Sequence, residues 1–99
     1  MADNGIEVFA AFTAKDGHQQ ELKTVLAAMA EEARSDAGCL RFDLLQNLED
    51  DHDFMFAEMW ESVEALADHR AMPYLNGYRD QRAPHLARKP VVRKWVPAD

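Results

Sequence analysis

The chain has 99 residues, of which 47% are hydrophobic and 29% charged, as is typical of one globular domain spanning residues 1–99. Asp and Glu outnumber Lys and Arg by 18 to 11, which gives a formal net charge of −7. Because an acidic chain lacks the positive surface that attracts phosphates, we expect no nucleic acid and no membrane among its partners.

The first residues, 1–5, lack the basic and apolar stretches of a secretory signal. No apolar run approaches the roughly 18 residues that span a bilayer. The single cysteine, Cys39, cannot form an internal disulfide, and we interpret it as a small buried hydrophobe rather than a redox switch. These features predict a cytoplasmic protein.

Apolar residues alternate with other residues from Ile6 to Ala14, which is the period of a β-strand. The second face of this strand is also partly apolar, at Phe9 and Ala11, which indicates a sheet covered on both faces. Helices can cover only one face in a chain of this size. We therefore expect a homodimer in which a second copy covers the other face.

Apolar residues then recur at helical spacing from Leu22 to Ala33, the strongest periodic signal in the chain. Asp16 and Gln19 have the spacing of a capping box and predict the start of this helix. Gly38, which can adopt a positive φ, predicts its end.

A second strand is predicted from residues 39–48, and its apolar face would comprise Leu40, Phe42, Leu44 and Leu48. An acidic turn at residues 49–53 leads into a third strand at residues 54–61, which predicts an antiparallel hairpin.

Ser62 is a suitable N-cap for a short helix that ends at Pro73. Pro73 can open a further helix in which Tyr74 and Tyr78 share a face, and a last strand covers residues 91–96. The order of elements predicts an α+β, ferredoxin-like split βαβ sandwich, with an antiparallel sheet and its helices on one face.

Three segments together carry a family resemblance. They are Phe12-x-x-Lys15-x-Gly17, Gly38-Cys39-Leu40-Arg41-Phe42, and Phe56-Ala57-Glu58-Met59-Trp60-Glu61 followed by Glu64-Ala65-Leu66-Ala67-Asp68-His69. In order and spacing they resemble the antibiotic biosynthesis monooxygenase family of small dimeric α+β barrel proteins. The resemblance implies a protomer that pairs sheet to sheet with a second copy. It also implies oxidation of phenolic or quinol-type aromatic substrates by dioxygen, without metal or flavin.

Glu58 is a candidate catalytic residue because strand alternation places it on the same face as Phe54, Phe56 and Trp60. Burial among aromatic rings raises the pKa of a carboxyl group, which makes it usable as an acid or base near neutral pH. In the alternative interpretation, Glu58 pairs with Arg41 or another cation across the sheet and only fixes the strand register.

His69 is the second candidate catalytic residue and lies at the border of the apolar face of its helix. An imidazole with a pKa of about 6.5 suits proton transfer, although such a histidine is more often a hydrogen-bonded structural residue. The resemblance adds that the family has a histidine at this place. Tyr74 stands where many relatives carry a second histidine, and its phenol is a hydrogen-bond donor rather than a base.

We expect a pocket for a flat aromatic substrate, with Trp60, Phe42 and Met72 against its ring. Tyr74 or Arg41 would stabilise the anion that forms when the substrate loses its phenolic proton.

Metal and heme sites are not expected. The histidines do not have the spacing of metal ligands, and they are His18, His52, His69 and His85. The resemblance includes a heme-degrading branch, but the Asn, Trp and His residues on which that branch relies are missing from the matching segments. We therefore predict an enzyme without a cofactor.

The favoured function is a cofactor-independent monooxygenase whose aromatic substrate itself supplies the electrons to dioxygen. Two alternatives stay open, a small-molecule-binding or stress-associated protein without turnover and an isomerase of a phosphorylated signalling sugar. The isomerase would need a basic phosphate site. We interpret the clustered cations near the C-terminus as solubilising groups, and they are Arg79, Arg82, Arg88, Lys89, Arg93 and Lys94.

Overall fold

The computed structural model describes residues 5–99, so most of the N-terminal stretch used in predicting the location of the protein lies outside the described residues. One antiparallel sheet has the strand order β2-β3-β1-β4, and its strands are β1 (Ile6–Thr13), β2 (Cys39–Gln46), β3 (Asp53–Trp60) and β4 (Val91–Trp95). The helices are α1 (Gln19–Ala33), α2 (Val63–Arg70) and α3 (Tyr74–Arg82), followed by a single 3-10 turn, η1 (Ala83–His85).

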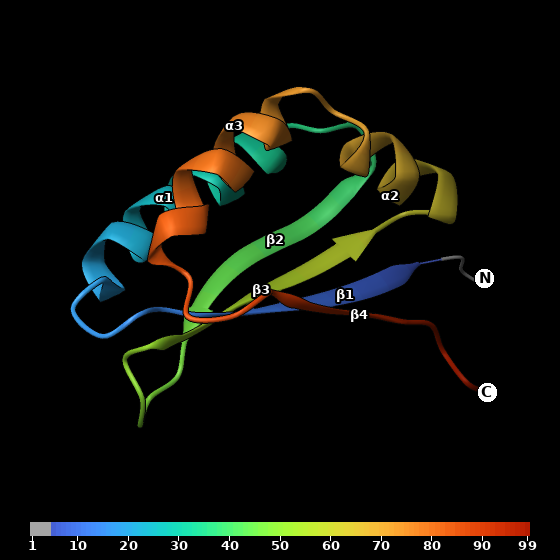
Figure 1. Cartoon of the computed structure of the whole chain (residues 1–99). Coiled ribbons are helices and arrows are strands. Elements are labelled where there is room, and N and C mark those ends of the chain that lie inside the picture. Colours follow the sequence, from blue (N-terminus) through green and yellow to red (C-terminus); the bar gives the residue numbers. More distant parts are fainter. Residues whose placement is uncertain (1–4) are drawn as a thin grey trace.

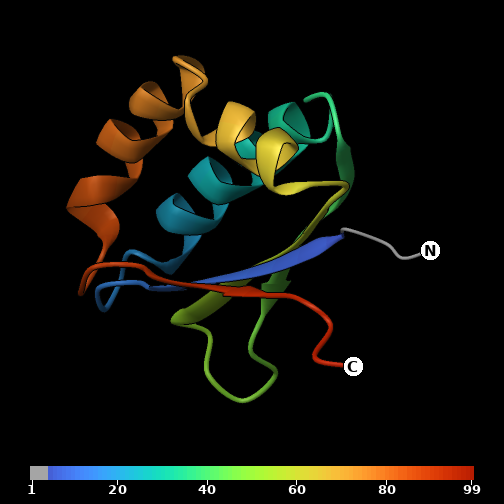
Figure 2. The ribbon, with the colours of Figure 1, turned by 90° about the vertical axis from the view of Figure 1, so that its right-hand side faces the viewer.

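Within residues 5–99, all three helices cover the same face of the sheet, and no helix or strand covers the other face (Figures 1 and 2). The predicted ferredoxin-like α+β fold is therefore confirmed. No helix within residues 5–99 is long and apolar enough to cross a bilayer.

The core lies between the sheet and α1. Alternate residues of β1, from Ile6 to Phe12, are buried toward the helices, as their period-two pattern predicts. Leu22, Leu26 and Ala33 from α1 pack onto them and are fully buried. Burial of this apolar surface, at about 25 cal/mol per Å², is the main force that holds the helical layer on the sheet.

The start of α1 differs from the prediction. The helix begins at Gln19 after His18, and no side chain caps its first turn, so the predicted capping box of Asp16 and Gln19 is wrong. The Asp16 carboxylate instead lies 3.1 Å from Nε2 of His52, across the sheet end in the β2–β3 hairpin. A tertiary contact has therefore replaced the local one.

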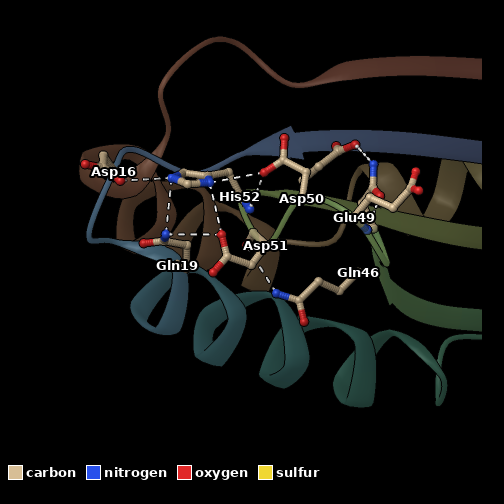
Figure 3. A network of polar contacts seen from close by, with 9 residues as sticks. Asp16, Gln19, Gln46, Glu49, Asp50, Asp51 and His52 are labelled. Carbon is tan, nitrogen blue, oxygen red and sulfur yellow. Dashed lines mark hydrogen bonds and ion pairs between the residues drawn. The ribbon is translucent and has the colours of Figure 1, made fainter.

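His52 is the centre of a polar network that joins the hairpin turn to the start of α1 (Figure 3). Its Nδ1 atom lies 3.1 Å from the carboxylates of both Asp50 and Asp51. The hydrogen bond to Asp16 is the main cause that raises the pKa of His52, and the contact with Asp50 adds to it. These contacts fix the turn geometry at an exposed end of the sheet.

The apolar face of β2 also differs from the prediction. A bulge between Cys39 and Arg41 shifts the register, so that Leu40 is 58% exposed rather than buried. Leu48 lies beyond the end of the strand and is 98% exposed. Phe42, after the bulge, is buried toward the helices as predicted.

The helical caps of the second half agree with the sequence. The hydroxyl of Ser62 accepts a hydrogen bond of 3.0 Å from the backbone N–H of Ala65 and caps α2. Tyr74 and Tyr78 share a face of α3 and meet edge to face with ring centres 6.0 Å apart.

Gly38 sets the approach of α2 to the end of α1. It has φ +81°, and a Cβ atom built on it would lie only 2.5 Å from Cβ of Ala65. Its carbonyl accepts a hydrogen bond of 2.9 Å from the backbone N–H of Glu61, just before α2. A side chain at this position would therefore meet both a strained backbone and a neighbouring helix.

We predict that Gly38→Ala lowers the free energy of unfolding by about 3 kcal/mol, because the left-handed conformation and overpacking against Ala65 both contribute. Gly17→Ala is the matched control, since Gly17 has φ +83° but no neighbour within 4 Å of its added Cβ. That variant should lose only about 1 kcal/mol. Urea unfolding measures both, and equal losses would show that the close approach to α2 has no energetic weight.

Candidate functional site

A cavity of about 90 Å³ lies between the helix-covered face of the sheet and the helices. Apolar side chains such as Phe12, Phe56 and Leu75 form much of its wall. Its ionisable side chains come from β3, α2 and α3, and they are Glu58, His69, Arg70, Arg79 and Arg82. Both candidate catalytic residues thus line one cavity, which the sequence could not show.

His69 is 5% exposed and is held by Asp36, whose Oδ2 atom lies 2.7 Å from Nδ1 of His69. The hydroxyl of Tyr74 donates a second hydrogen bond, of 2.6 Å, to the same oxygen. Because a carboxylate oxygen only accepts, the proton of a neutral His69 ring lies on Nδ1. Nε2 then carries a lone pair and can accept a proton.

Nε2 of His69 is open to the cavity. None of the hydrogen bonds among residues 5–99 uses this atom, and no fully buried side-chain nitrogen or oxygen atom in that range lacks a partner. Nε2 therefore has contact with the space that His69 lines. The ring is fixed by a stack on Trp60, with centres 4.4 Å apart, and by an edge contact with Phe42.

Tyr74 acts as a hydrogen-bond donor in this group, as the sequence predicted. Burial, followed by the contact with Asp36, raises the pKa of the Tyr74 phenol far above its ordinary value. The phenol therefore stays protonated at any physiological pH and continues to orient Asp36.

Glu58 is 7% exposed and has no cation in ion-pair contact among the described residues. Its one hydrogen bond to a side chain comes from the indole N–H of Trp60, at 3.0 Å. Burial raises the pKa of Glu58 to about 7, opposed by that hydrogen bond and by the positive charge of Arg70. The carboxyl group can therefore gain or lose a proton near neutral pH.

Arg41 does not reach this group. It pairs with Asp43 at 2.7 Å in a half-exposed ion pair, and its strand position opposite Met59 places it on the uncovered face of the sheet. The alternative in which Arg41 neutralises Glu58 is therefore wrong. The expected contact of Arg41 with the same substrate would require the substrate to reach the other face.

The residues expected to contact the substrate ring do not line this cavity. Trp60 and Phe42 are fully buried and support His69 from behind rather than line the cavity. Met72 lies between α2 and α3, is half-exposed and is absent from the cavity wall. Phe12 and Phe56 instead present the aromatic surface.

Sequence reasoning missed Asp36 and the arginines. Asp36 lies in the turn after α1, where nothing in the local pattern distinguishes it from a solvated loop residue. Arg79 and Arg82 were interpreted as solubilising, but both line the cavity together with Arg70. The sequence did indicate that Arg79 and Arg82 lie together, because they are three residues apart and therefore share a face of α3.

The possible metal ligands lie outside the cavity. Within residues 5–99, the one group of side chains close enough to share an ion is Asp50, Asp51 and His52, in the network of Figure 3. These groups are mostly exposed and hydrogen-bond one another, which accounts for their proximity.

Comparisons with known proteins agree with the fold. The family model for antibiotic biosynthesis monooxygenase matches residues 5–81. A Mycobacterium tuberculosis protein named "Putative monooxygenase Rv0793" is 30% identical over 95% of this chain and 92% of its own length. Its solved structure superposes with a TM-score of 0.87 at 28% identity over 96% of each chain.

Two further proteins are similar to this chain over most of its length. The structure of PA3566 from Pseudomonas aeruginosa has a TM-score of 0.88 at 26% identity, over 100% of this chain and 98% of that one. The uncharacterized protein sll1783 of Synechocystis is 28% identical over 94% of this chain. This chain spans only 63% of the length of sll1783.

We predict that the buried carboxyl group of Glu58 makes the protein less stable as pH rises. Its pKa is higher in the folded chain than in the unfolded chain, so the unfolded state holds fewer protons between pH 4.5 and about 7. The wild type should therefore lose roughly 3 kcal/mol of unfolding free energy across this window, relative to Glu58→Gln. Urea unfolding at several pH values measures the difference.

The indole N–H of Trp60 provides an independent readout of the same titration. Its proton resonance should shift with a midpoint near pH 7 in the wild type and not in Glu58→Gln, because this N–H donates to the carboxylate. A raised pKa at Glu58 would be contradicted if the stability of the two proteins had the same pH dependence and the Trp60 resonance of the wild type did not shift near pH 7.

Proposed function

The chain belongs to the antibiotic biosynthesis monooxygenase family, and from this premise we propose that it is a cofactor-independent monooxygenase that oxidises a phenolic or quinol-type aromatic substrate with dioxygen. The observation that carries the proposal is the free Nε2 atom of His69, fixed by Asp36 and facing the same cavity as Glu58. We further propose that it acts in the cytoplasm, where its free Cys39 would stay reduced.

His69 is the proposed base. The Asp36 carboxylate holds the Nδ1 proton and stabilises the imidazolium that forms when Nε2 takes a phenolic proton. Tyr74 donates to the same carboxylate oxygen, so the ring orientation is set before the substrate arrives. General-base assistance of this kind contributes about 10²- to 10⁴-fold to a rate.

Glu58 is proposed as the second proton-transfer group. A quinol must lose two protons, and a carboxyl group with a pKa of about 7 can accept one and return it within a turnover. Trp60 connects the two groups, since it stacks on His69 and donates to Glu58.

The redox chemistry needs no further cofactor, since the substrate anion is the reductant. The phenolate gives one electron to dioxygen, and the resulting aryloxyl radical and superoxide combine to form a carbon–oxygen bond. Cleavage of the oxygen–oxygen bond then releases water, so one quinol and one dioxygen yield one hydroxyquinone and one water. The chain's contribution is to remove the proton and to hold the pair of aryloxyl radical and superoxide away from bulk water.

The cavity size limits the substrate. A volume of about 90 Å³ is well below the roughly 300 Å³ of a typical small-molecule site. We therefore propose that a single aromatic ring lies against Phe12 and Phe56, while any larger part of the substrate extends through the opening toward solvent.

A second candidate is the isomerase of a phosphorylated signalling sugar. One observation favours it, since Arg70, Arg79 and Arg82 on the cavity supply the basic groups that such a substrate needs. The aromatic wall of Phe12 and Phe56 fits a flat ring better than a sugar, so we place this function second. A protein that binds the same ligands without turnover is the remaining outcome.

We also propose that the protein is a homodimer formed through the uncovered face of its sheet. Figure 2 shows that no helix of the described residues covers this face, and several apolar side chains on it are exposed. Trp95, Val91 and Leu45 each keep about half of their surface exposed, and Phe9 lies between them on β1. A patch of this kind, on a face that would otherwise contact water, is typical of a subunit interface.

We predict that His69→Ala lowers quinol turnover by roughly 10²- to 10⁴-fold, as expected for loss of a general base. Dioxygen uptake with a panel of small quinols measures the rate. Added imidazole should restore part of the activity, because a free base can occupy the space that the side chain leaves. A purely structural role of His69 would give no such rescue.

The matched control is His85→Ala, since His85 is a partly buried histidine that contacts His18 and lies away from the cavity. This variant should keep wild-type turnover. If His69→Ala oxidises quinols at the wild-type rate, the base is misassigned, and if no quinol is consumed by the wild type, the monooxygenase proposal fails.

We predict a sedimentation mass near twice 11.3 kDa at micromolar concentration. Trp95→Glu should shift the protein to a monomer, because it buries a charge at the proposed interface. Leu48→Glu is the control, since Leu48 is exposed in the hairpin turn and away from the strands. A folded wild-type monomer that persists at high concentration would exclude the dimer.

A further inference from the structure

Three arginines at the cavity have no anionic partner. Arg70, Arg79 and Arg82 all line it, and none takes part in an ion pair among the described residues. The chain as a whole carries a net charge of −7, so carboxylates are abundant elsewhere. A cluster of unpaired positive charge in an acidic protein therefore needs a specific explanation.

The arginines lie at the outer part of the cavity, and the candidate catalytic pair lies deep. Glu58 and His69 are buried, whereas Arg70 is exposed and Arg79 and Arg82 are half-exposed. A ligand that enters from solvent would therefore meet the guanidinium groups first and the proton-transfer groups last.

Arg82 is held in place without a carboxylate. Its guanidinium lies 4.9 Å from the ring centre of Phe12, and its Nη1 atom lies 3.7 Å from the sulfur of Met29. Among the residues that the structure describes, Arg79 donates only to the neutral amide of Asn76, at 3.3 Å. These contacts hold Arg82 against apolar groups and leave most hydrogen-bond donors of both arginines available.

The environment is unfavourable for these charges as they stand. Burial lowers the pKa of Arg82, and the neighbouring charge of Arg79 lowers it further. An anion between the two would relieve the repulsion and use the planar donor forks, which match carboxylate and phosphate oxygens.

We propose that the substrate carries an oxyanion group, a carboxylate or a phosphate, which Arg79 and Arg82 bind with Arg70 beside them while its aromatic ring occupies the cavity. The identity of the ring as a quinol rests on the proposed function, but the oxyanion rests on the arginines alone. The substrate class thus becomes a quinol that carries an anionic group rather than a neutral quinol.

Equilibrium binding tests the charge requirement without any turnover. The probe is gentisate, a single-ring quinol with one carboxylate, and its uncharged amide is the matched ligand control. Under anaerobic conditions we expect gentisate to bind at least about tenfold more tightly than the amide, as one charge-assisted contact provides. Phenyl phosphate serves as the second arm, and tighter binding of it than of gentisate identifies the group as a phosphate.

Arginine variants locate the contact. Arg79→Gln and Arg82→Gln should each weaken gentisate binding about tenfold and leave binding of the amide unchanged. Arg82→Lys keeps a positive charge over Phe12 but lacks the planar guanidinium. Its affinity for gentisate should therefore lie between those of Arg82→Gln and the wild type. The control is Arg88→Gln, which removes the same charge from an exposed residue outside the cavity and should have less than about a twofold effect at physiological salt.

The outcomes separate this inference from the proposed function. If gentisate binds in an arginine-dependent way but is not oxidised in air, the oxyanion site is supported and the proposed monooxygenase function is contradicted. If gentisate and its amide bind with equal affinity and are oxidised at equal rates, the monooxygenase function is supported and the oxyanion site is overturned. Equal affinity for charged and neutral ligands, or an equal effect of Arg79→Gln and Arg88→Gln, also overturns it.

Discussion

One carboxylate oxygen connects the turn after α1 to both of the other helices. Oδ2 of Asp36, just after α1, accepts hydrogen bonds from His69 of α2 and from Tyr74 of α3, so a single atom joins all three helices. A helix of eight residues such as α2 is not stable alone, and its position depends on contacts of this kind. Because the same bond fixes Nδ1 of His69, the structural and chemical interpretations of this histidine are compatible. Nδ1 serves the fold, and Nε2 faces the cavity.

The cavity contains several features that folding alone would disfavour. Glu58 is buried with an indole N–H as its one side-chain hydrogen-bond partner, and Arg82 lies on apolar surface without a carboxylate. Apolar side chains at both places would pack more favourably, since burial of an unpaired charge costs several kcal/mol. These features lie around one cavity of a core that is otherwise apolar. Local departures from good packing that gather at one place are typical of a functional site.

The sequence predicted those elements whose pattern is set by burial on one face. The alternation of β1, the helical period of α1 and the hydroxyl cap of Ser62 each appear as expected, because each reflects a strong local preference. The errors occur where a distant residue decides the outcome. Asp16 contacts His52 instead of capping α1, and a bulge in β2 places Leu40 on the exposed side. The candidate site shows the same division, since residues far apart in the sequence meet only through the tertiary fold.

Electrostatic coupling connects the outer and inner parts of the cavity. The positive charge of Arg70 holds the pKa of Glu58 below the value that burial alone would give. An anionic group bound at the arginines would offset this charge and raise the pKa of Glu58 further. The carboxylate of Glu58 would then be a stronger acceptor for the second proton that a quinol must lose. Occupation of the arginine site would in this way couple substrate binding to proton transfer at Glu58, while Asp36 continues to fix Nδ1 of His69.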